Sequence, residues 1–198
     1  MELEHKIKTL LLSRQEASGL FYEYSQLPEF TSILTQICNS IILAITYKHK
    51  LLIAGNGGSF SDAQHMAAEF VSRFSFDRVP FPALALGTNI SSFSAVANDY
   101  TFEYVFTREL EAYANVGDIL LLISTSGESR NILSAAQYAI NNKMTVYGLT
   151  GNQDSTLRSL VPCLQIPFNK TALIQEYHII IEHIISQVTE EILSNINT

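Results

Sequence analysis

The sequence predicts an α/β fold with three layers, in which helices cover both faces of a doubly wound, five-stranded parallel sheet. Five short apolar runs of strand length alternate with helical segments from residue 51 onward. Each run is apolar at successive positions instead of at every second one, which indicates strands buried on both faces. Alternation of such strands with helices is typical of a parallel sheet wound with helices.

Two helices are expected ahead of the sheet, over residues 3–25 and 29–48, with a Leu-Pro step between them. Both are apolar enough to require a packing partner. Residues 1–48 are therefore interpreted as a helical extension of a single domain over residues 1–198. The near-helical spacing is carried by Leu10, Leu11, Ile33, Ile37, Ile41 and Leu43.

The strands and helices that follow can be placed from the same patterns. The apolar runs are LLIA (51–54), ALAL (83–86), ILLLIS (119–124), TVYGL (145–149) and CLQI (163–166). Further helices are predicted over about residues 61–74, 103–114, 130–142 and 171–195. Ligands of open α/β sheets bind beyond the carboxyl ends of the strands, at a switch point in strand order. The chemistry is therefore expected in the loops at 55–60, 87–100, 124–129 and 167–172.

The composition excludes several classes of function. The 198 residues carry a formal charge of −7, which gives no basic surface for nucleic acid. Cys38 and Cys163 stand far apart without a CxxC motif, so neither a disulfide framework nor a thiolate zinc site is indicated. No uninterrupted run approaches the ~18 to 20 apolar residues needed to cross a bilayer, and the start lacks the apolar core of a signal peptide. We expect a soluble, cytoplasmic protein.

The glycine loop GNGGS (55–59) follows a strand and opens a helix, where backbone N–H groups attract an anion. It does not fit a dinucleotide fingerprint, because the third glycine position is Phe60, and it lacks the lysine of a P-loop. The alternative is a tight turn without a ligand.

The loop STSGES (124–129) places four hydroxyl groups around one glycine, between a strand and a helix. Such a loop can surround a phosphate with O–H and N–H donors while the helix dipole adds partial positive charge. The alternative is an ordinary serine-rich helix cap, but four hydroxyls in six residues exceed what a cap uses. The pattern favours a phosphate site formed by Ser124, Thr125, Ser126 and Ser129.

His65 and Glu69 are four residues apart in a predicted helix, so their side chains share one face. Two such groups can bind one metal ion, and the carboxylate can also act as a base beside a carbonyl. The spacing is not H-E-x-x-H, which excludes a zincin protease. Taken alone, the pair is more often a solvated surface pair.

Polar side chains interrupt the apolar pattern of the last predicted helix at Gln175, Glu176, His178, Glu182 and His183. Gln175 and His183 project about 80° apart and can face one cavity from successive turns. His178 and His183 project about 140° apart, so both cannot face it. Periodicity does not choose between the two histidines, and either could be a hydrogen-bonded interface residue.

Asn98 and Asp99 follow an apolar stretch in one of the expected loops, and their side chains suit sugar hydroxyls. Asn and Asp also end helices and begin turns for purely local reasons, so these two residues alone establish no ligand.

Together these features resemble the sugar isomerase (SIS) domain and, within it, the phosphoheptose isomerase family. The resemblance covers nearly the whole chain and rests on an ordered set of motifs: GNGGS-x-x-DAQH-x-AAEF, ANDY, ISTSG-x-S and IQE-x-H-x(4)-H. One departure is visible, since the family commonly has arginine directly before the IQE triplet and this chain has Leu173.

The resemblance implies one bound zinc ion in each subunit and selects His183 over His178. The implied zinc ligands are His65, Glu69, Gln175 and His183. The implied substrate contacts are Asn56, Gly57, Gly58, Glu69, Asn98, Asp99, Ser124, Thr125, Ser126, Ser129 and Gln175, with the serine and threonine group around the phosphate.

The implied activity interconverts sedoheptulose 7-phosphate and D-glycero-D-manno-heptose 7-phosphate through an enediol, the first step of bacterial heptose synthesis for surface polysaccharide such as lipopolysaccharide. Glu69 would be the base and His183 the acid, while zinc would polarise the carbonyl. Family members are typically homotetramers with sites at subunit interfaces, and this would give the two N-terminal helices their packing partners.

Two alternatives differ from this activity: a non-catalytic SIS regulator of the replication-initiation type, and an isomerase for another sugar phosphate. Such regulators tend to lack the catalytic acid and histidine, whereas this chain keeps Glu69 and His183. Because Leu173 replaces the arginine common in the family, an isomerase for another sugar phosphate stays a possible interpretation. A nucleotide-dependent oxidoreductase is disfavoured by Phe60 and by the hydroxyl-rich second loop.

Overall fold

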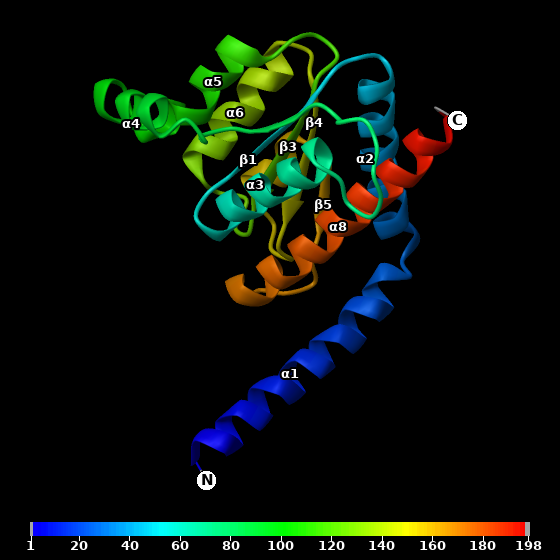
Figure 1. The fold of residues 1–198 in the computed structure, drawn as a ribbon. Helices are drawn as coiled ribbons and strands as arrows, with labels where there is room; N and C mark the ends of the chain where they lie inside the picture. Colours follow the sequence, from blue (N-terminus) through cyan, green and yellow to red (C-terminus); the bar gives the residue numbers. More distant parts are fainter. Residues whose placement is uncertain (1, 197–198) are drawn as a thin grey trace.

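The computed structural model describes residues 2–196, and their backbone forms the predicted parallel sheet (Figure 1). The strand order is β2-β1-β3-β4-β5, and every pairing is parallel. Because β1 lies between β2 and β3, the switch point in strand order lies between β1 and β3. The strands lie within one residue of the predicted runs: β1 (Leu51–Gly55), β2 (Ala83–Ala85), β3 (Ile119–Ser124), β4 (Thr145–Thr150) and β5 (Cys163–Gln165).

Helices cover both faces of this sheet. The helical segments are α1 (Glu2–Ser25), α2 (Pro28–Thr46), α3 (Gly58–Val71), α4 (Ile90–Asp99), the 3-10 turn η1 (Phe102–Tyr104), α5 (Val105–Tyr113), α6 (Arg130–Asn141), α7 (Thr156–Leu160) and α8 (Thr171–Ile196). The α/β class and the layered architecture predicted from the apolar runs are confirmed.

The central strands are apolar throughout because their two faces belong to two separate cores. Ile53 and Leu121 are fully buried in the core that also contains residues of α2, α3 and α8. Their neighbours Leu52 and Leu120 are fully buried in the second core, which contains residues of α4, α5 and α6. Successive strand residues point to opposite faces, so a strand covered on both sides needs an apolar side chain at each position.

Residues 90–99 form α4, so our expectation of a loop over 87–100 was wrong for most of that segment. The helix begins after Asn89, whose side chain accepts a hydrogen bond from the backbone N–H of Ser92 at 3.3 Å. Serines fill the positions between the apolar residues and made the segment look like a loop. The apolar residues at helical spacing are Ile90, Phe93, Val96 and Ala97.

The ends of two other helices differ from the prediction. Helix α3 begins at Gly58 instead of Ser61 and ends at Val71 instead of Phe74. The 3-10 turn η1 precedes α5, where one continuous helix was expected, and the short helix α7 was not predicted. Because α3 starts earlier, the last two residues of the glycine loop, Gly58 and Ser59, form part of the first turn of the helix.

The two N-terminal helices are placed differently, although they were predicted together as one extension. Helix α2 contributes the fully buried Ile37 and Ile41 to the sheet core. Helix α1 projects away from the rest of the chain (Figure 1), and Leu11 on it is 66% exposed. Its second half meets the body, where Arg14 forms an ion pair with Glu176 at 2.8 Å and the ring of Phe21 packs 4.5 Å from that of Tyr177. The oligomerisation role of these helices remains a prediction.

Helix α2 is long and apolar enough, by length and composition, to cross a membrane, and no other helix within residues 2–196 meets that test. Our expectation from uninterrupted runs differed because polar residues such as Gln36 and Asn39 break the run while the average remains apolar. Since α2 packs its buried face into the sheet core, the core helix of a folded domain explains the same composition.

Candidate active site

Helices α3 and α8 bring three of the predicted site residues together on one side of the sheet. His65 and Glu69 project from α3, and the closest His65–Glu69 distance is 3.4 Å, from Nε2 to Oε1. His183 projects from α8, and its Nε2 lies 3.1 Å from the Nε2 of His65. The sequence placed His65 and Glu69 on one face of a helix, and the fold adds His183 from 118 residues away.

These distances suit a shared divalent cation. Two nitrogen ligands about 2.0–2.1 Å from one tetrahedral zinc ion lie about 3.3 Å apart, which is close to the separation of the two imidazole nitrogens. Within residues 2–196, no three His, Cys, Asp or Glu side chains form a complete metal-binding group. The fit therefore rests on the two measured pairs and on the chemistry of the donors, which are two imidazoles and a carboxylate.

The side chain of Gln175 reaches the first turn of α3. A Cβ atom added at Gly58 would collide with the side-chain amide of Gln175, so the absence of a side chain at Gly58 leaves room for that amide. Gly57, the residue before it, has a φ of +59°, a left-handed conformation that favours glycine. The double glycine thus has two separate steric reasons, one for each residue.

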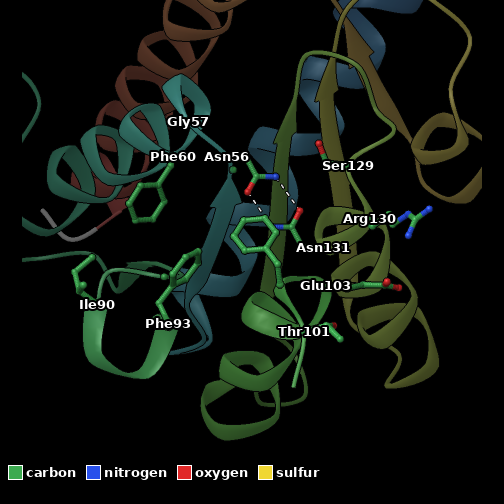
Figure 2. A pocket seen from close by; sticks show the side chains of 13 residues that line it. Asn56, Gly57, Phe60, Ile90, Phe93, Thr101, Glu103, Ser129, Arg130 and Asn131 are labelled. Carbon is green, nitrogen blue, oxygen red and sulfur yellow. Dashed lines mark hydrogen bonds between the residues drawn. The ribbon is translucent and has the colours of Figure 1, made fainter. Parts of the chain in front are cut away.

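A cavity of about 850 Å³ opens at the carboxyl ends of β1 and β3, at the switch point of the sheet (Figure 2). Asn56 lines it and exchanges two hydrogen bonds with Asn131, at 2.8 and 2.9 Å. Phe60 and Phe93 form an aromatic wall on the other side, with ring centroids 6.4 Å apart. The remaining lining residues are Gly55, Gly57, Gly87, Ile90, Thr101, Phe102, Glu103, Ser129 and Arg130.

The loop at 124–129 is held in place largely by its own hydroxyl groups. Ser124 Oγ accepts a hydrogen bond from the Gly127 N–H at 3.1 Å, and Ser126 Oγ accepts one from the Glu128 N–H at 3.2 Å. Both hydroxyl hydrogens remain available as donors. Ser129 lines the cavity and precedes α6 without capping it through its side chain. The loop thus combines free O–H donors with the amino terminus of a helix.

Glu128 belongs to the same loop but points to a different partner. Its carboxylate accepts hydrogen bonds from the backbone N–H and the hydroxyl of Thr156, at 2.6 and 2.8 Å. These bonds hold the pKa of Glu128 below its ordinary value. Because the carboxylate is tied to α7, the hydroxyl groups of the loop are its main polar groups toward a ligand.

Of the predicted substrate contacts, only Asn56, Gly57 and Ser129 line the cavity. Asn98 and Asp99 lie at the exposed end of α4, where Asn98 Nδ2 donates to Asp99 Oδ1 at 2.8 Å, and neither lines the cavity. His178 is fully buried, with Nε2 3.3 Å from the carbonyl oxygen of Thr150. Burial lowers the pKa of His178 to about 4, against the opposing effect of that hydrogen bond. His178 is thus a neutral core residue.

Sequence reasoning missed Asn131 and the aromatic wall. Asn131 lies in the first turn of α6, and its position directly behind the hydroxyl-rich loop is the signal in the sequence that could have indicated it. Phe60 was used only to exclude a dinucleotide site. No local pattern indicated that Phe60 and Phe93 would face each other, because α3 and α4 meet only through the fold.

Glu182 is a fully buried carboxylate beside the helix face that carries His183. Neither of its side-chain oxygens has a hydrogen-bond partner among the described residues. Burial, together with the charge of Asp62, raises the pKa of Glu182 from 4.5 to about 8. A protonated Glu182 therefore fits the apolar seam between α3 and α8 better than an ionised one.

The fold and the site together define a protein of the SIS-domain class. The chain matches the family model of the SIS domain over residues 25–151, which contains the glycine loop, α3 and the hydroxyl-rich loop.

Comparison with curated proteins narrows the class. The chain is 45% identical over 156 residues to the phosphoheptose isomerase of Burkholderia pseudomallei strain K96243, covering 78% of this chain and 79% of that protein. It is 40% identical over 190 residues to the phosphoheptose isomerase of a Nitratiruptor species, covering 96% of this chain and 98% of that protein. A solved structure of a phosphoheptose isomerase from Francisella tularensis matches with a TM-score of 0.87 at 32% identity. The match covers 96% of this chain and 99% of that one. The chain belongs to the phosphoheptose isomerase family, as its motifs predicted.

We predict that Glu182→Gln changes the pH dependence of stability. Between pH 4.5 and about 8 the folded chain keeps a proton on Glu182 that the unfolded chain releases, so the free energy of unfolding falls as the pH rises. The variant should match the wild type at pH 5 and be more stable by about 1–3 kcal/mol at pH 8.

Urea unfolding of the metal-free protein at the two pH values measures this difference. Glu191→Gln, an exposed change on the same helix, is the matched control and should alter neither value. Equal losses of stability with pH in the wild type and in Glu182→Gln would contradict the assignment.

Proposed function

We propose that the chain interconverts sedoheptulose 7-phosphate and D-glycero-D-manno-heptose 7-phosphate. The observation that carries the proposal is the meeting of His65, Glu69 and His183 at 3.1 and 3.4 Å, on a helix, α3, whose first turn lines the cavity at the switch point through Phe60. Relatives that are 40% and 45% identical to this chain over the aligned residues are named phosphoheptose isomerases. A site with a base, an imidazole and hydroxyl donors suits a phosphorylated sugar better than a nucleotide.

Moving a carbonyl between C2 and C1 requires removal of a proton from one carbon and its return to the neighbouring carbon through an enediol. Glu69 is the proposed base, because its carboxylate lies 3.4 Å from the imidazole of His65, which in turn meets His183. The Glu69 side chain is 22% exposed, so it is accessible to a substrate while α3 holds its backbone. His183 is the proposed acid that serves the substrate oxygens.

We further propose that His65, Glu69, Gln175 and His183 hold one zinc ion. A cation at this position would supply Lewis-acid chemistry by polarising the carbonyl and stabilising charge on the enediolate oxygens. Imidazole, carboxylate and amide ligands also accept other divalent ions. The contact between the Gln175 amide and Gly58 supports this set, because it places the fourth donor at the helix that carries two of the others.

The phosphate is proposed to bind the loop at 124–129. The Ser124 and Ser126 hydroxyls already accept bonds from the loop backbone, so their hydrogens can donate to phosphate oxygens. The amino terminus of α6 adds its N–H groups and partial positive charge. Asn56 and Asn131 lie between this loop and the glycine turn, where an amide pair can contact sugar hydroxyls.

The comparisons favour neither of the two alternatives, a non-catalytic regulator and an isomerase for another sugar phosphate. A non-catalytic regulator would not need His65, Glu69 and His183 to converge, and the curated relatives reported above carry an enzyme name. An isomerase for another sugar phosphate would use the same residues, so the substrate itself must decide. Because both proposed sugars are phosphorylated metabolites of bacterial heptose synthesis, which feeds surface polysaccharide such as lipopolysaccharide, we propose a cytoplasmic location.

We propose that four copies of the chain assemble through α1. Leu3, Leu10 and Leu11 are 72%, 58% and 66% exposed, and the helix projects beyond the body (Figure 1). An isolated helix with this much exposed apolar surface is unlike a monomer surface. His65 is 47% exposed in the single chain, so a neighbouring subunit could cover the site.

Direct assay tests the function. We predict that full-length protein supplied with Zn²⁺ converts sedoheptulose 7-phosphate to the aldose, followed by NMR, and that a chelator abolishes turnover until Zn²⁺ is restored. Fructose 6-phosphate is the control for another ketose phosphate. If the folded, zinc-supplied protein makes no aldose, the proposal fails and a regulator becomes the better assignment.

We predict that Glu69→Gln lowers kcat by about 10²–10⁴-fold, because an amide cannot accept the proton. The KM for substrate should change far less than kcat, since the phosphate loop is untouched. Glu111→Gln, an exposed change on α5, is the control and should leave both constants unchanged. Turnover of Glu69→Gln near the wild-type rate would exclude Glu69 as the base.

We predict that Leu11→Asp lowers the native mass measured by light scattering, because a charge on the exposed apolar face of α1 cannot be buried between subunits. Val116→Asp provides the control, since Val116 is 81% exposed in a loop remote from α1. An unchanged mass for Leu11→Asp would show that this face of α1 is not the interface.

A further inference from the structure

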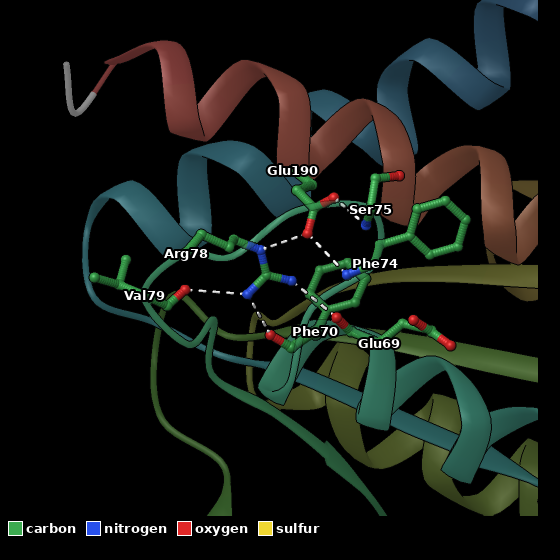
Figure 3. Close-up of polar contacts among 7 residues, drawn as sticks. All are labelled: Glu69, Phe70, Phe74, Ser75, Arg78, Val79 and Glu190. Carbon is green, nitrogen blue, oxygen red and sulfur yellow. Dashed lines mark hydrogen bonds and ion pairs between the residues drawn. The ribbon is translucent and has the colours of Figure 1, made fainter.

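A buried ion pair joins the end of α3 to α8 (Figure 3). Arg78 Nε lies 2.9 Å from Glu190 Oε1, and the two side chains are only 5% and 0% exposed. Arg78 follows α3 in the chain, and Glu190 lies on α8. Two buried charges are costly unless they are fully hydrogen-bonded, so their remaining contacts show what the pair holds in place.

The guanidinium of Arg78 binds the last turn of α3. Its Nη2 donates to the backbone carbonyl of Glu69 at 2.8 Å, and Nη1 donates to the carbonyls of Phe70 and Val79 at 2.8 and 3.0 Å. Carbonyls at the end of a helix have no partner within the helix and attract positive charge. Arg78 therefore fixes the backbone of Glu69, the residue whose side chain belongs to the proposed site.

The carboxylate of Glu190 binds the segment that leaves α3. It accepts hydrogen bonds from the backbone N–H groups of Phe74 and Ser75, at 2.8 and 2.6 Å. The ring of Phe74 in turn packs against the ring of His183, with centroids 5.5 Å apart. The network thus touches the backbone of Glu69 on one side and, through Phe74, the imidazole of His183 on the other.

Helical geometry places the pair along the seam that carries the site. Glu190 follows His183 by seven residues, which is two turns, so the two side chains project from nearly the same face of α8. One half of the proposed site is on α3 and the other half is on α8. A bond between the helices at this point limits both their separation and their sliding.

We propose that Arg78 and Glu190 are positioning residues that set the approach of α3 to α8, and through it the convergence of His65, Glu69 and His183. This inference rests on the function proposed above. The two residues do not touch the proposed substrate or metal, so they act only through the residues that they hold.

The ionisation of Glu190 agrees with this geometry. Burial acts to raise the pKa of Glu190, but the N–H donors of Phe74 and Ser75 and the charge of Arg78 outweigh it and hold the pKa below the ordinary value. The carboxylate thus stays charged at neutral pH and accepts every bond described.

The chain offers a matched control outside the network that joins α3 to α8. Asp118 is also buried and accepts hydrogen bonds from two backbone N–H groups, those of Lys50 and Asn115, at 3.0 and 2.7 Å. Its other partner is the Lys50 ammonium at 2.6 Å. Asp118 directly precedes β3, and neither Lys50 nor Asn115 belongs to α3 or α8, so Asp118 shares the chemistry of Glu190 but not its contacts with the two helices of the site.

The test compares Glu190→Gln, Arg78→Lys and Asp118→Asn in the full-length protein. We expect the first two to raise the dissociation constant for Zn²⁺, measured by calorimetry without substrate, by about 10- to 100-fold. The kcat should fall by up to about 100-fold, while KM stays within about twofold. All three variants should lower the thermal midpoint by similar amounts, but Asp118→Asn should leave zinc affinity and kcat unchanged.

Arg78→Lys keeps a positive charge beside Glu190 but loses the fork that reaches the Glu69 and Phe70 carbonyls, so it tests positioning even where Glu190→Gln unfolds. Wild-type zinc affinity and kcat in a folded Arg78→Lys would overturn the proposal. Equal losses of zinc affinity in Asp118→Asn would also overturn it, since they would indicate a general effect of stability. Zinc binding is measured apart from turnover, so a wild type that binds zinc but makes no aldose would overturn the proposed reaction alone.

Discussion

The packing of α3 against α8 on one face of the sheet is the constraint on which the site depends. Met66 and Phe70 of α3 and Ile181 and Ile185 of α8 belong to one buried apolar core. Burial of this seam is non-directional, and it brings the helices together at a distance set by their side chains. The polar residues of the site stand beside the seam, so this apolar packing brings together the two helices on which the histidines meet.

The order of the strands supplies the second half of the site. Because the switch point lies between β1 and β3, the glycine loop and the hydroxyl-rich loop leave the sheet side by side and open a cavity between them. The glycine loop connects this cavity with the helix seam, since Gly57 lines the cavity and Gly58 contacts Gln175. A substrate with a phosphate at one end and a carbonyl at the other could therefore span both parts.

Two buried carboxylates on α8 show how the same residue type takes opposite states. Glu190 receives two backbone N–H donors and a guanidinium, and its pKa lies below the ordinary value. Glu182 has no donor among the described residues, and burial raises its pKa to about 8. The difference comes from neighbours contributed by other parts of the chain. It follows that Glu190 binds the segment after α3 as an anion, whereas Glu182 fills the seam as a neutral acid.

Local sequence determined the class of fold and the position of each strand, because a strand buried on both faces must be apolar at every position. It also placed His65 and Glu69 on one face of a helix. It mistook α4 for a loop, since serines obscured the apolar spacing, and helix geometry alone did not choose between His178 and His183. Only the tertiary structure decided that His178 is buried, that His183 meets His65, and that Arg78 binds Glu190. Such pairings join distant segments, and their geometry depends on how helices pack across the sheet, which no short-range periodicity encodes.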